Sequence, residues 1–439
     1  MSGHYGLAAG VFVLFMVLCA MRMPIAVAMF LSGAFGYIEI AGLGRLLTFM
    51  NENAYSRVST YDLSVVPLFL LMGQIATNGG LSRTLYRAAR AWFGHYPGGI
   101  AIATIGGCAA FGAICGSSVA TGATMSSVAL PEMRRYGYKG SFATGALAAG
   151  GTLGILIPPS IIMVIYSILT EQSLGTMFLA AIVPGIISTI GYALAALIYV
   201  RLTPDAAPRA ERMPMIERFG SLLALGPIAL IFAVVVGGIY LGVFTPTEGA
   251  AVGAVVTAIL AWSMGDLDGA GLANAVIETA KLTGMIFIIL IGAEVYGAFL
   301  ALSGAPQGLA AWISGAGFSP MIVLLAIIGV YFILGCVMDG IPMILLTVPV
   351  FFPIIAGLDF GMGPEATAIW FGILIVIVVE VGLITPPVGI NVYVINSMAK
   401  DIPLGETFKG ILPFLMSDIC RIALIMLFPI TCTWLPGLK

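Results

Sequence analysis

The chain has 439 residues, of which 60% are hydrophobic and only 9% are charged, and its formal net charge is −2. A soluble domain carries roughly 25% charged residues, and a nucleic-acid-binding protein needs a basic surface, so both classes are excluded. Two histidines and six scattered cysteines predict neither a histidine metal site nor a disulfide framework. The mean hydropathy of +1.10 and apolar runs that approach the roughly 20 residues of a transmembrane helix indicate an all-α polytopic membrane protein.

The first half of the chain alternates apolar segments with polar or basic stretches. We expect membrane helices near 6–21, 25–42 and 63–77, a split pair of short helices near 98–133, a broken helix at 140–170 and a helix at 174–202. The first of these segments lacks the basic start and the cleavage site of a signal peptide, so we interpret it as a membrane helix. The polar stretch 44–62 predicts an amphipathic helix along the membrane surface.

The second half repeats this order of segments. Pro24 and Pro246 are separated by the same number of positions as Pro131 and Pro353, which indicates an internal duplication. The corresponding segments are 219–244, 247–262, 282–302, a split pair near 319–358, a broken helix near 367–399 and a last helix near 411–435, with the polar stretch 263–281 as a second amphipathic helix.

The most informative motif occurs once in each half. Residues 154–160 read Gly-Ile-Leu-Ile-Pro-Pro-Ser, and residues 382–388 read Gly-Leu-Ile-Thr-Pro-Pro-Val, each within a long apolar run. Proline has no N–H to donate, so it breaks a helix, and lipid does not tolerate the backbone groups left unpaired. Such breaks survive where they line a cavity or bind a ligand. Two of them at matching places predict the binding site of a transporter.

The distribution of basic residues predicts the orientation of the split pairs. Basic side chains flank the first pair on both sides (Arg83, Arg87, Arg90, Arg134, Arg135 and Lys139), whereas neither flank of the second pair (303–318 and 359–366) holds one. Because basic loops stay in the cytoplasm, the two pairs open to opposite sides. Two full spans or a re-entrant hairpin both fit, and we favour hairpins, because the arms are short and the tip of the first is polar. Each half then crosses the membrane five times, which gives an inverted-topology repeat with both termini outside.

The tip of the first hairpin combines small residues with hydroxyl groups. Ser117, Ser118 and Thr121 supply hydroxyl oxygens, and a cation such as Na⁺ prefers oxygens from hydroxyls, carboxylates and the unwound carbonyls of half-helices. We therefore expect a sodium site where this tip faces the break of its own half. The alternative interpretation is that the small residues only permit tight helix packing.

The tip of the second hairpin carries an acid, Asp339, in the run Val-Met-Asp-Gly-Ile-Pro. A carboxylate at membrane depth costs about 2.5–3.5 kcal/mol on insertion scales and therefore needs a partner or a function. Residues 282–399 contain no Lys or Arg, so we interpret Asp339 as a cation ligand or proton carrier, or as the cap of a helix that begins at Gly340. Glu380 and, more weakly, Glu294 compete for the role of cation ligand or proton carrier.

The residues that follow each break lie near the start of a second half-helix, whose N–H groups suit an anion. They are Ser160 and Tyr166 in the first half, and Asn391, Tyr393 and Asn396 after Thr385 in the second. Packing between helices is an alternative role for the two tyrosines. No arginine clamp is visible at membrane depth, so a carboxylate substrate would be held by helix N-termini, hydroxyls and bound cations. Our candidate substrate-binding residues are Ser118, Ser160, Thr385, Asn391 and Tyr393.

Three runs, 237–248, 151–160 and 384–391, resemble the large membrane subunit (DctM-like) of tripartite ATP-independent periplasmic (TRAP) transporters, and the resemblance covers essentially the whole chain. It implies an elevator mechanism, in which a transport domain with two opposed hairpins slides against a scaffold domain. It also implies Na⁺ as the coupling ion, a periplasmic binding protein that delivers an organic acid, and a small four-helix (DctQ-like) subunit on a separate polypeptide, in the bacterial inner membrane.

Carried over by position, the resemblance implies two sodium sites. The first uses Ser117, Ser118, Thr121 and the backbone near Gly154 and Pro158, and the second uses Asp339, the backbone near Gly335, and Thr385 to Pro386. The scaffold would comprise 1–97 and 219–302, and the transport elements 98–202 and 303–439, with a cytoplasmic linker at 203–218.

The sequence leaves one alternative function open and disfavours another. A stand-alone sodium- or proton-coupled carboxylate carrier or antiporter of related inverted-repeat design is the alternative to a TRAP subunit. An enzyme is not expected, because the chain has no HExxH or GxSxG motif. His95 also lies outside the apolar runs, so the hairpin serines lack a base.

Overall fold

The computed structural model describes residues 4–438, and the regular elements in that range are all helical. The helices of the first half are α1 (Tyr5–Ala20), α2 (Ile25–Ala41), α3 (Leu43–Val58), α4 (Val65–Asn78), α5 (Leu81–Phe93), α6 (Gly99–Cys115), α7 (Ser118–Arg135), α8 (Gly140–Leu156), α9 (Ile161–Thr170) and α10 (Leu174–Leu202). The predicted segments agree with these bounds to within a few residues, because glycine, proline and polar runs separate the apolar stretches.

The helices of the second half are α11 (Met215–Leu223), α12 (Gly226–Phe232), α13 (Gly238–Tyr240), α14 (Pro246–Ser263), α15 (Gly269–Ser303), α16 (Ala305–Gly315), α17 (Pro320–Gly335), α18 (Gly340–Ala356), α19 (Pro364–Ile384), α20 (Ile390–Met398), α21 (Leu404–Leu427) and α22 (Ile430–Thr433). The start of α14 is a capping box, in which the Glu248 carboxylate accepts from the Thr245 N–H at 2.8 Å and the Thr245 hydroxyl accepts from the Glu248 N–H at 3.3 Å.

Two predicted elements differ from the structure. The last helix, expected near 411–435, begins at Leu404 and ends at Leu427, and the short α22 follows it. The stretch 263–281 was expected to form a separate amphipathic helix, but most of it is the first part of α15, a continuous helix of 35 residues. In the first half, a 3₁₀ turn at Tyr61–Ser64 separates α3 from α4. The stretch from Gly269 to Lys281 contains no proline and continues directly into the apolar run, so nothing interrupts the helix there.

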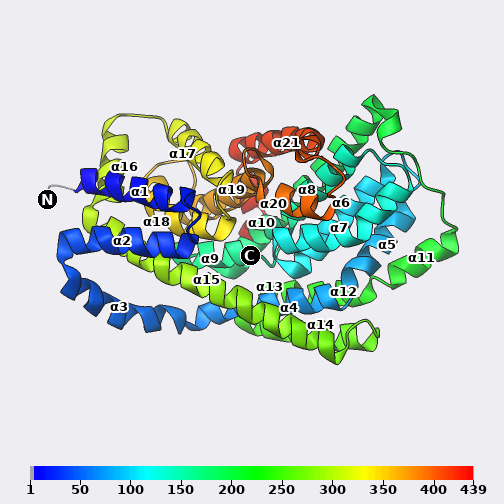
Figure 1. Cartoon of the computed structure of the whole chain (residues 1–439), viewed down its shortest axis with the longest axis horizontal. Helices are drawn as coiled ribbons and strands as arrows, with labels where there is room; N and C mark the ends of the chain where they lie inside the picture. The colour runs from blue at the N-terminus through cyan, green and yellow to red at the C-terminus, as the bar shows by residue number, and fades with distance from the viewer. Residues whose placement is uncertain (1–3, 439) are drawn as a thin grey trace.

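Four helices form one side of the molecule. α2 packs along α15, and α4 packs against both α15 and α14; in Figure 1, α15 appears as a long rod with α4 and α14 beside it. The two broken helices, α8–α9 and α19–α20, are surrounded by α6, α7, α10, α17, α18 and α21. The apolar window of α19 is 100% buried and that of α8–α9 is 83% buried, so the broken helices lie at the centre of the fold.

The two hairpins open toward opposite ends of the molecule. The open end of the first hairpin, at Arg134 on α7, forms an ion pair with Asp401, just beyond α20. The open end of the second hairpin, at Phe352 on α18, packs its ring against Tyr166 of α9 with centroids 6.3 Å apart. Each hairpin base therefore lies beside the second half-helix of the other repeat, which confirms the inverted arrangement.

The outer faces of the helices match a lipid environment. Six described helices are long and apolar enough to cross a membrane, or up to seven if a bent helix pair is counted as one span. On α10, the side chains of Ile186, Ile190, Leu194 and Ile198 recur every fourth residue and are all about half exposed. This spacing places them on one face of the helix, where water would be an unfavourable neighbour and lipid a favourable one.

Candidate functional site

Both Pro-Pro motifs break their helices, as predicted. α8 ends at Leu156 and α9 begins at Ile161, and α19 ends at Ile384 and α20 begins at Ile390. The bonds Pro158–Pro159 and Pro386–Pro387 are both cis. The two breaks differ in their surroundings, since Pro158 and Pro159 are buried whereas Pro386 and Pro387 are exposed.

The first hairpin tip lies directly against the first break. Gly116, which ends α6, adopts a left-handed conformation (φ +64°), and a Cβ there would lie 2.9 Å from the Pro159 carbonyl oxygen. A Cβ on Gly154 would lie 2.8 Å from the carbonyl oxygen of Ser117 and 2.5 Å from the hydroxyl oxygen of Thr121. The Thr121 hydroxyl is fully buried and has no hydrogen-bond partner. The structure therefore brings Ser117, Thr121 and Gly154 together around an unpaired oxygen.

This arrangement fits a sodium ion on chemical grounds. The groups in contact are a hydroxyl and backbone carbonyls, which are the neutral oxygen ligands that suit a hard monovalent cation. Among the described residues, no group of three His, Cys, Asp or Glu side chains is close enough to hold a metal ion. The first hairpin tip therefore supplies hydroxyl and carbonyl oxygens that suit Na⁺, and the described residues contain no cluster suited to a transition metal.

The second hairpin contacts the second break through glycine backbones. A Cβ on Gly335 would lie 3.0 Å from the Cα of Gly382. Asp339 is the N-cap of α18, and its carboxylate accepts from the Gly340 N–H at 2.7 Å. The Thr385 hydroxyl donates to the Val381 carbonyl at 2.6 Å. Asp339 thus caps α18, as one of the interpretations expected. Gly335 lies near the second break, as predicted. The structure gives no contact between Asp339 and Thr385.

A cavity of about 320 Å³ lies where the two hairpin tips meet. Asp339 and Ile341 line it from the second tip, and Ser117 and Ser118 line it from the first. Side chains of α4 and α15 close the opposite wall, namely Leu70, Leu282, Met285 and Ile286. Small-molecule sites are typically apolar hollows with a few placed polar groups, and this cavity has that character.

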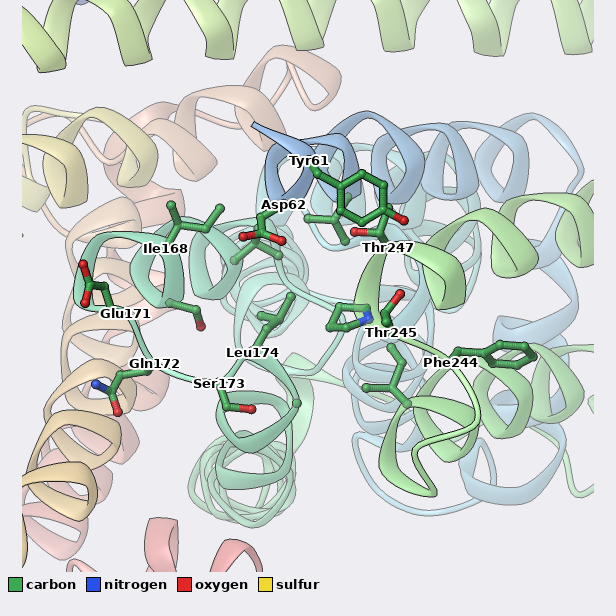
Figure 2. Close-up of a pocket in the computed structure, with 16 residues that line it drawn as sticks. Tyr61, Asp62, Ile168, Glu171, Gln172, Ser173, Leu174, Phe244, Thr245 and Thr247 are labelled. Atoms are coloured by element: carbon green, nitrogen blue, oxygen red, sulfur yellow. The ribbon is translucent and has the colours of Figure 1, made fainter. Parts of the chain in front are cut away.

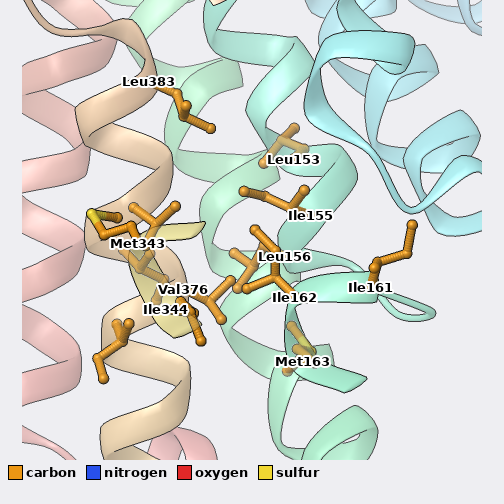
Figure 3. Close-up of a cluster of buried hydrophobic side chains, with 14 of the residues drawn as sticks. Leu153, Ile155, Leu156, Ile161, Ile162, Met163, Met343, Ile344, Val376 and Leu383 are labelled. Carbon is orange, nitrogen blue, oxygen red and sulfur yellow. The ribbon is translucent and has the colours of Figure 1, made fainter. Parts of the chain in front are cut away.

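Three helices begin at the wall of this cavity. Ser118, Ile161 and Ile341 line it, and they are the first or second residues of α7, α9 and α18. Free N–H groups and the positive end of the helix dipole favour negative charge at such positions. Figure 3 shows the apolar packing beside it, where Leu156 and Ile162, on either side of the first break, lie near Met343 and Ile344 of α18.

The other predicted substrate residues are scattered. Ser160 is buried and its hydroxyl has no partner, and the same holds for both polar atoms of the Asn391 side chain. Asn391 lies on α20, which packs against α7 and α8. Tyr393 is 48% exposed and does not line the cavity between the tips. The Tyr166 hydroxyl donates to the Ala368 carbonyl at 2.6 Å, so Tyr166 joins α9 to α19.

A larger hollow of about 590 Å³ lies among connecting loops (Figure 2). It is lined from three separate loops, with Asp62 before α4, Glu171 and Gln172 between α9 and α10, and Thr245 before α14. The trace predicted from the sequence places all three loops on one side of the membrane, and in the structure they line one hollow.

Sequence reasoning missed a buried charged cluster. Arg421 on α21 lies 2.8 Å from Asp418 on the same helix and 3.3 Å from Glu380 on α19. Glu380 was predicted to compete with Asp339 for the role of cation ligand or proton carrier, and a basic partner near it in the sequence was excluded. The sequence feature that could have indicated this cluster is the spacing of Asp418 and Arg421, since residues three apart share a helix face.

The chain matches the family model described as "Tripartite ATP-independent periplasmic transporter, DctM component" over residues 12–431. It is 38% identical to the C4-dicarboxylate TRAP transporter large permease protein DctM of Pseudomonas aeruginosa, covering 86% of this chain and 85% of that protein. It is 31% identical to the ectoine TRAP transporter large permease protein TeaC of Halomonas elongata, covering 93% of each. The fold resembles the YdaH transporter of Alcanivorax borkumensis, with a TM-score of 0.62, 14% identity, and coverage of 95% of this chain and 98% of that one.

Proposed function

This chain belongs to the DctM family of tripartite ATP-independent periplasmic transporters, and from that premise we propose that it imports a small organic acid anion together with sodium ions by an elevator mechanism. Members of the family are transporter permeases, so the prediction of a transporter rather than an enzyme is confirmed. The cargo, the coupling ion and the movement are our proposal.

The cavity between the hairpin tips is the single observation that carries the proposal. It lies where Ser118 and Asp339 of the two tips face α4 and α15. The helix N-termini at its wall favour an anion. Its volume of about 320 Å³ suits a small substrate, and the relatives named for C4-dicarboxylates and ectoine support the class of small carboxylates.

Sodium coupling is supported by the first hairpin tip. The unpaired Thr121 hydroxyl beside Gly154 and the Ser117 carbonyl supply neutral oxygens. A cation bound there would lie next to the substrate cavity and would offset the charge of the anion. Asp339 would supply a negatively charged ligand to a second cation.

The elevator movement is supported by the division of the fold. The hairpins and broken helices pack with one another, whereas α2, α4, α14 and α15 form a separate packed group. Because the cavity is lined from both groups, sliding of one against the other would carry the substrate while α4 and α15 stay in place. The two groups would then act as transport and scaffold domains.

A DctQ-like small membrane subunit and a periplasmic binding protein are the proposed partners, and the bacterial inner membrane, with both termini periplasmic, is the proposed location. The isethionate relative of Oleidesulfovibrio alaskensis, 31% identical over 98% of this chain and 65% of that protein, carries the name DctMQ. That name supports an association between large and small subunits.

The test is substrate uptake into proteoliposomes that hold this chain and its small subunit, with Na⁺, pH and the binding protein varied separately. We expect uptake of a C4-dicarboxylate or another small carboxylate to require an inward Na⁺ gradient and the binding protein. Uptake that follows a proton gradient without Na⁺ would overturn sodium coupling. Uptake that needs neither the binding protein nor the small subunit would favour the stand-alone carrier instead.

A further inference from the structure

A charged cluster lies in the protein interior at the junction of three helices. Arg421 and Asp418 come from α21, Glu380 from α19, and Ser188 and Tyr192 from α10. The cluster lies outside the cavity between the hairpin tips, because none of its residues lines that cavity.

The cluster contains more negative than positive charge. Arg421 is 4% exposed, and Glu380 and Asp418 are 0% exposed. Two carboxylates and one guanidinium leave one negative charge without compensation if both acids are ionised. An isolated buried charge is strongly unfavourable, and the usual outcome is that the group binds a proton and becomes neutral.

The hydrogen bonds identify which acid holds this proton. Asp418 has two stabilising donors, since Arg421 lies 2.8 Å from its Oδ1 and the Tyr192 hydroxyl donates to its Oδ2 at 3.0 Å. Glu380 has the longer contact of 3.3 Å from Arg421 to its Oε2, and its other neighbour is the backbone of Leu156. Because its contact with the guanidinium is shorter by half an ångström, Asp418 is the better-stabilised anion of the two.

We propose that Glu380 is a proton-binding site in the core of the transport elements, and that it holds one proton at neutral pH while Asp418 and Arg421 stay ionised as a pair. The site is separate from the proposed sodium ligands and does not depend on them. Its ligand is H⁺ alone, and its protonation brings the charge of the cluster to zero.

The groups that face Glu380 from the surrounding helices agree with this assignment. α21 presents Arg421 and Asp418, and α8 presents the backbone of Leu156. α10 presents Tyr192, whose hydroxyl bonds Asp418 and lies 3.3 Å from the Thr152 hydroxyl of α8. Arg421 is thus the cation in direct contact with both acids of the cluster.

Infrared spectroscopy of the purified protein in lipid nanodiscs tests the proposal. A protonated carboxylic acid in a dry interior has a carbonyl-stretch band separate from those of carboxylates and amides. We expect this band in the wild type at neutral pH, and we expect Glu380→Gln to lose it. Asp418→Asn should also lose it, because Glu380 then becomes the sole acid beside Arg421 and ionises. Asp339→Asn should keep it.

Isotope labelling provides a second measurement that needs no variant. Carboxyl-labelled glutamate should shift the band, whereas labelled aspartate should leave it in place. A wild type without the band, a band that persists in Glu380→Gln, or a band that shifts with labelled aspartate would each overturn the proposal. None of these results would contradict sodium-driven uptake. If uptake does not depend on Na⁺ while the infrared band is present, only the proposed function is overturned.

Discussion

Gly382 of α19 and Gly335 of α17 touch through their backbones, and a Cβ on Gly382 would lie 2.5 Å from the Cα of Gly335. The first half contains the same relation, since a Cβ on Gly112 would lie 2.6 Å from the Cα of Gly154. Each hairpin is thus held against the broken helix of its own half at a pair of glycines. This contact sets the distance between a hairpin tip and the break that it faces.

Replacement of Gly382 by alanine is expected to destabilise the protein by about 1–3 kcal/mol, because overpacking of a close backbone contact forces the two helices apart. Thermal melting of the detergent-solubilised protein measures the loss. Gly329→Ala on α17 is the matched control, because a Cβ there has no atom within 4 Å. Equal melting temperatures for the two variants would contradict the close contact.

Thr121→Val is expected to weaken apparent Na⁺ affinity about tenfold with little change in stability, because it removes one oxygen ligand, worth on the order of 1.4 kcal/mol, and keeps the shape of the side chain. Sodium titration of uptake, or of the melting temperature, measures the change. Thr124→Val on the same helix, where Thr124 lines a different hollow, is the control. Thr121→Ser should restore most of the affinity, and an unchanged Na⁺ dependence in Thr121→Val would remove this hydroxyl from the site.

Asp339→Asn is expected to lower apparent Na⁺ affinity, because the amide keeps an oxygen that can cap α18 but loses the negative charge. The same sodium titration measures the effect. Ser319→Ala, at the N-cap of α17 but without a side-chain capping hydrogen bond, controls for changes at a hairpin helix start. If Asp339→Asn titrates like the wild type, the carboxylate serves only as a helix cap.

Arg421→Gln is expected to destabilise the protein by about 3–5 kcal/mol, because removal of one partner leaves buried carboxylates without compensation. Thermal melting again provides the measurement. Arg135→Gln is the control, since the Arg135 side chain is 73% exposed and surface ion pairs contribute little. Adding Glu380→Gln and Asp418→Asn to Arg421→Gln should recover part of the loss, and a melting temperature for Arg421→Gln equal to that of Arg135→Gln would exclude this role.

The local features of the chain are predictable from the sequence. The breaks at Pro158 and Pro386 follow from the missing N–H of proline, and the capping box at Thr245 and Glu248 follows from side chains three residues apart. The limits of α10 follow from the length of one apolar run. In each case the physical cause lies within a few residues of its effect.

Contacts between segments that are far apart in the sequence are harder to predict. The sequence predicted hydroxyl oxygens at Ser117 and Thr121, but only the fold shows that Gly154 lies against them. Tyr393 was a candidate for substrate binding, yet it lies on a half-exposed face. The continuous helix α15 also escaped prediction, because a polar composition alone does not end a helix.

The sequence determines local structure, but only the tertiary structure determines that Arg421 pairs with Glu380. Composition, apolar run length and the duplicated Pro-Pro motif were enough to establish a membrane protein built from two similar halves, since these depend on residue type and local order. Which buried acid meets which buried base depends on how α19, α21 and α10 pack. Helices that are apolar on nearly every face can pack in many ways, and only the assembled fold selects the one that brings these charges together.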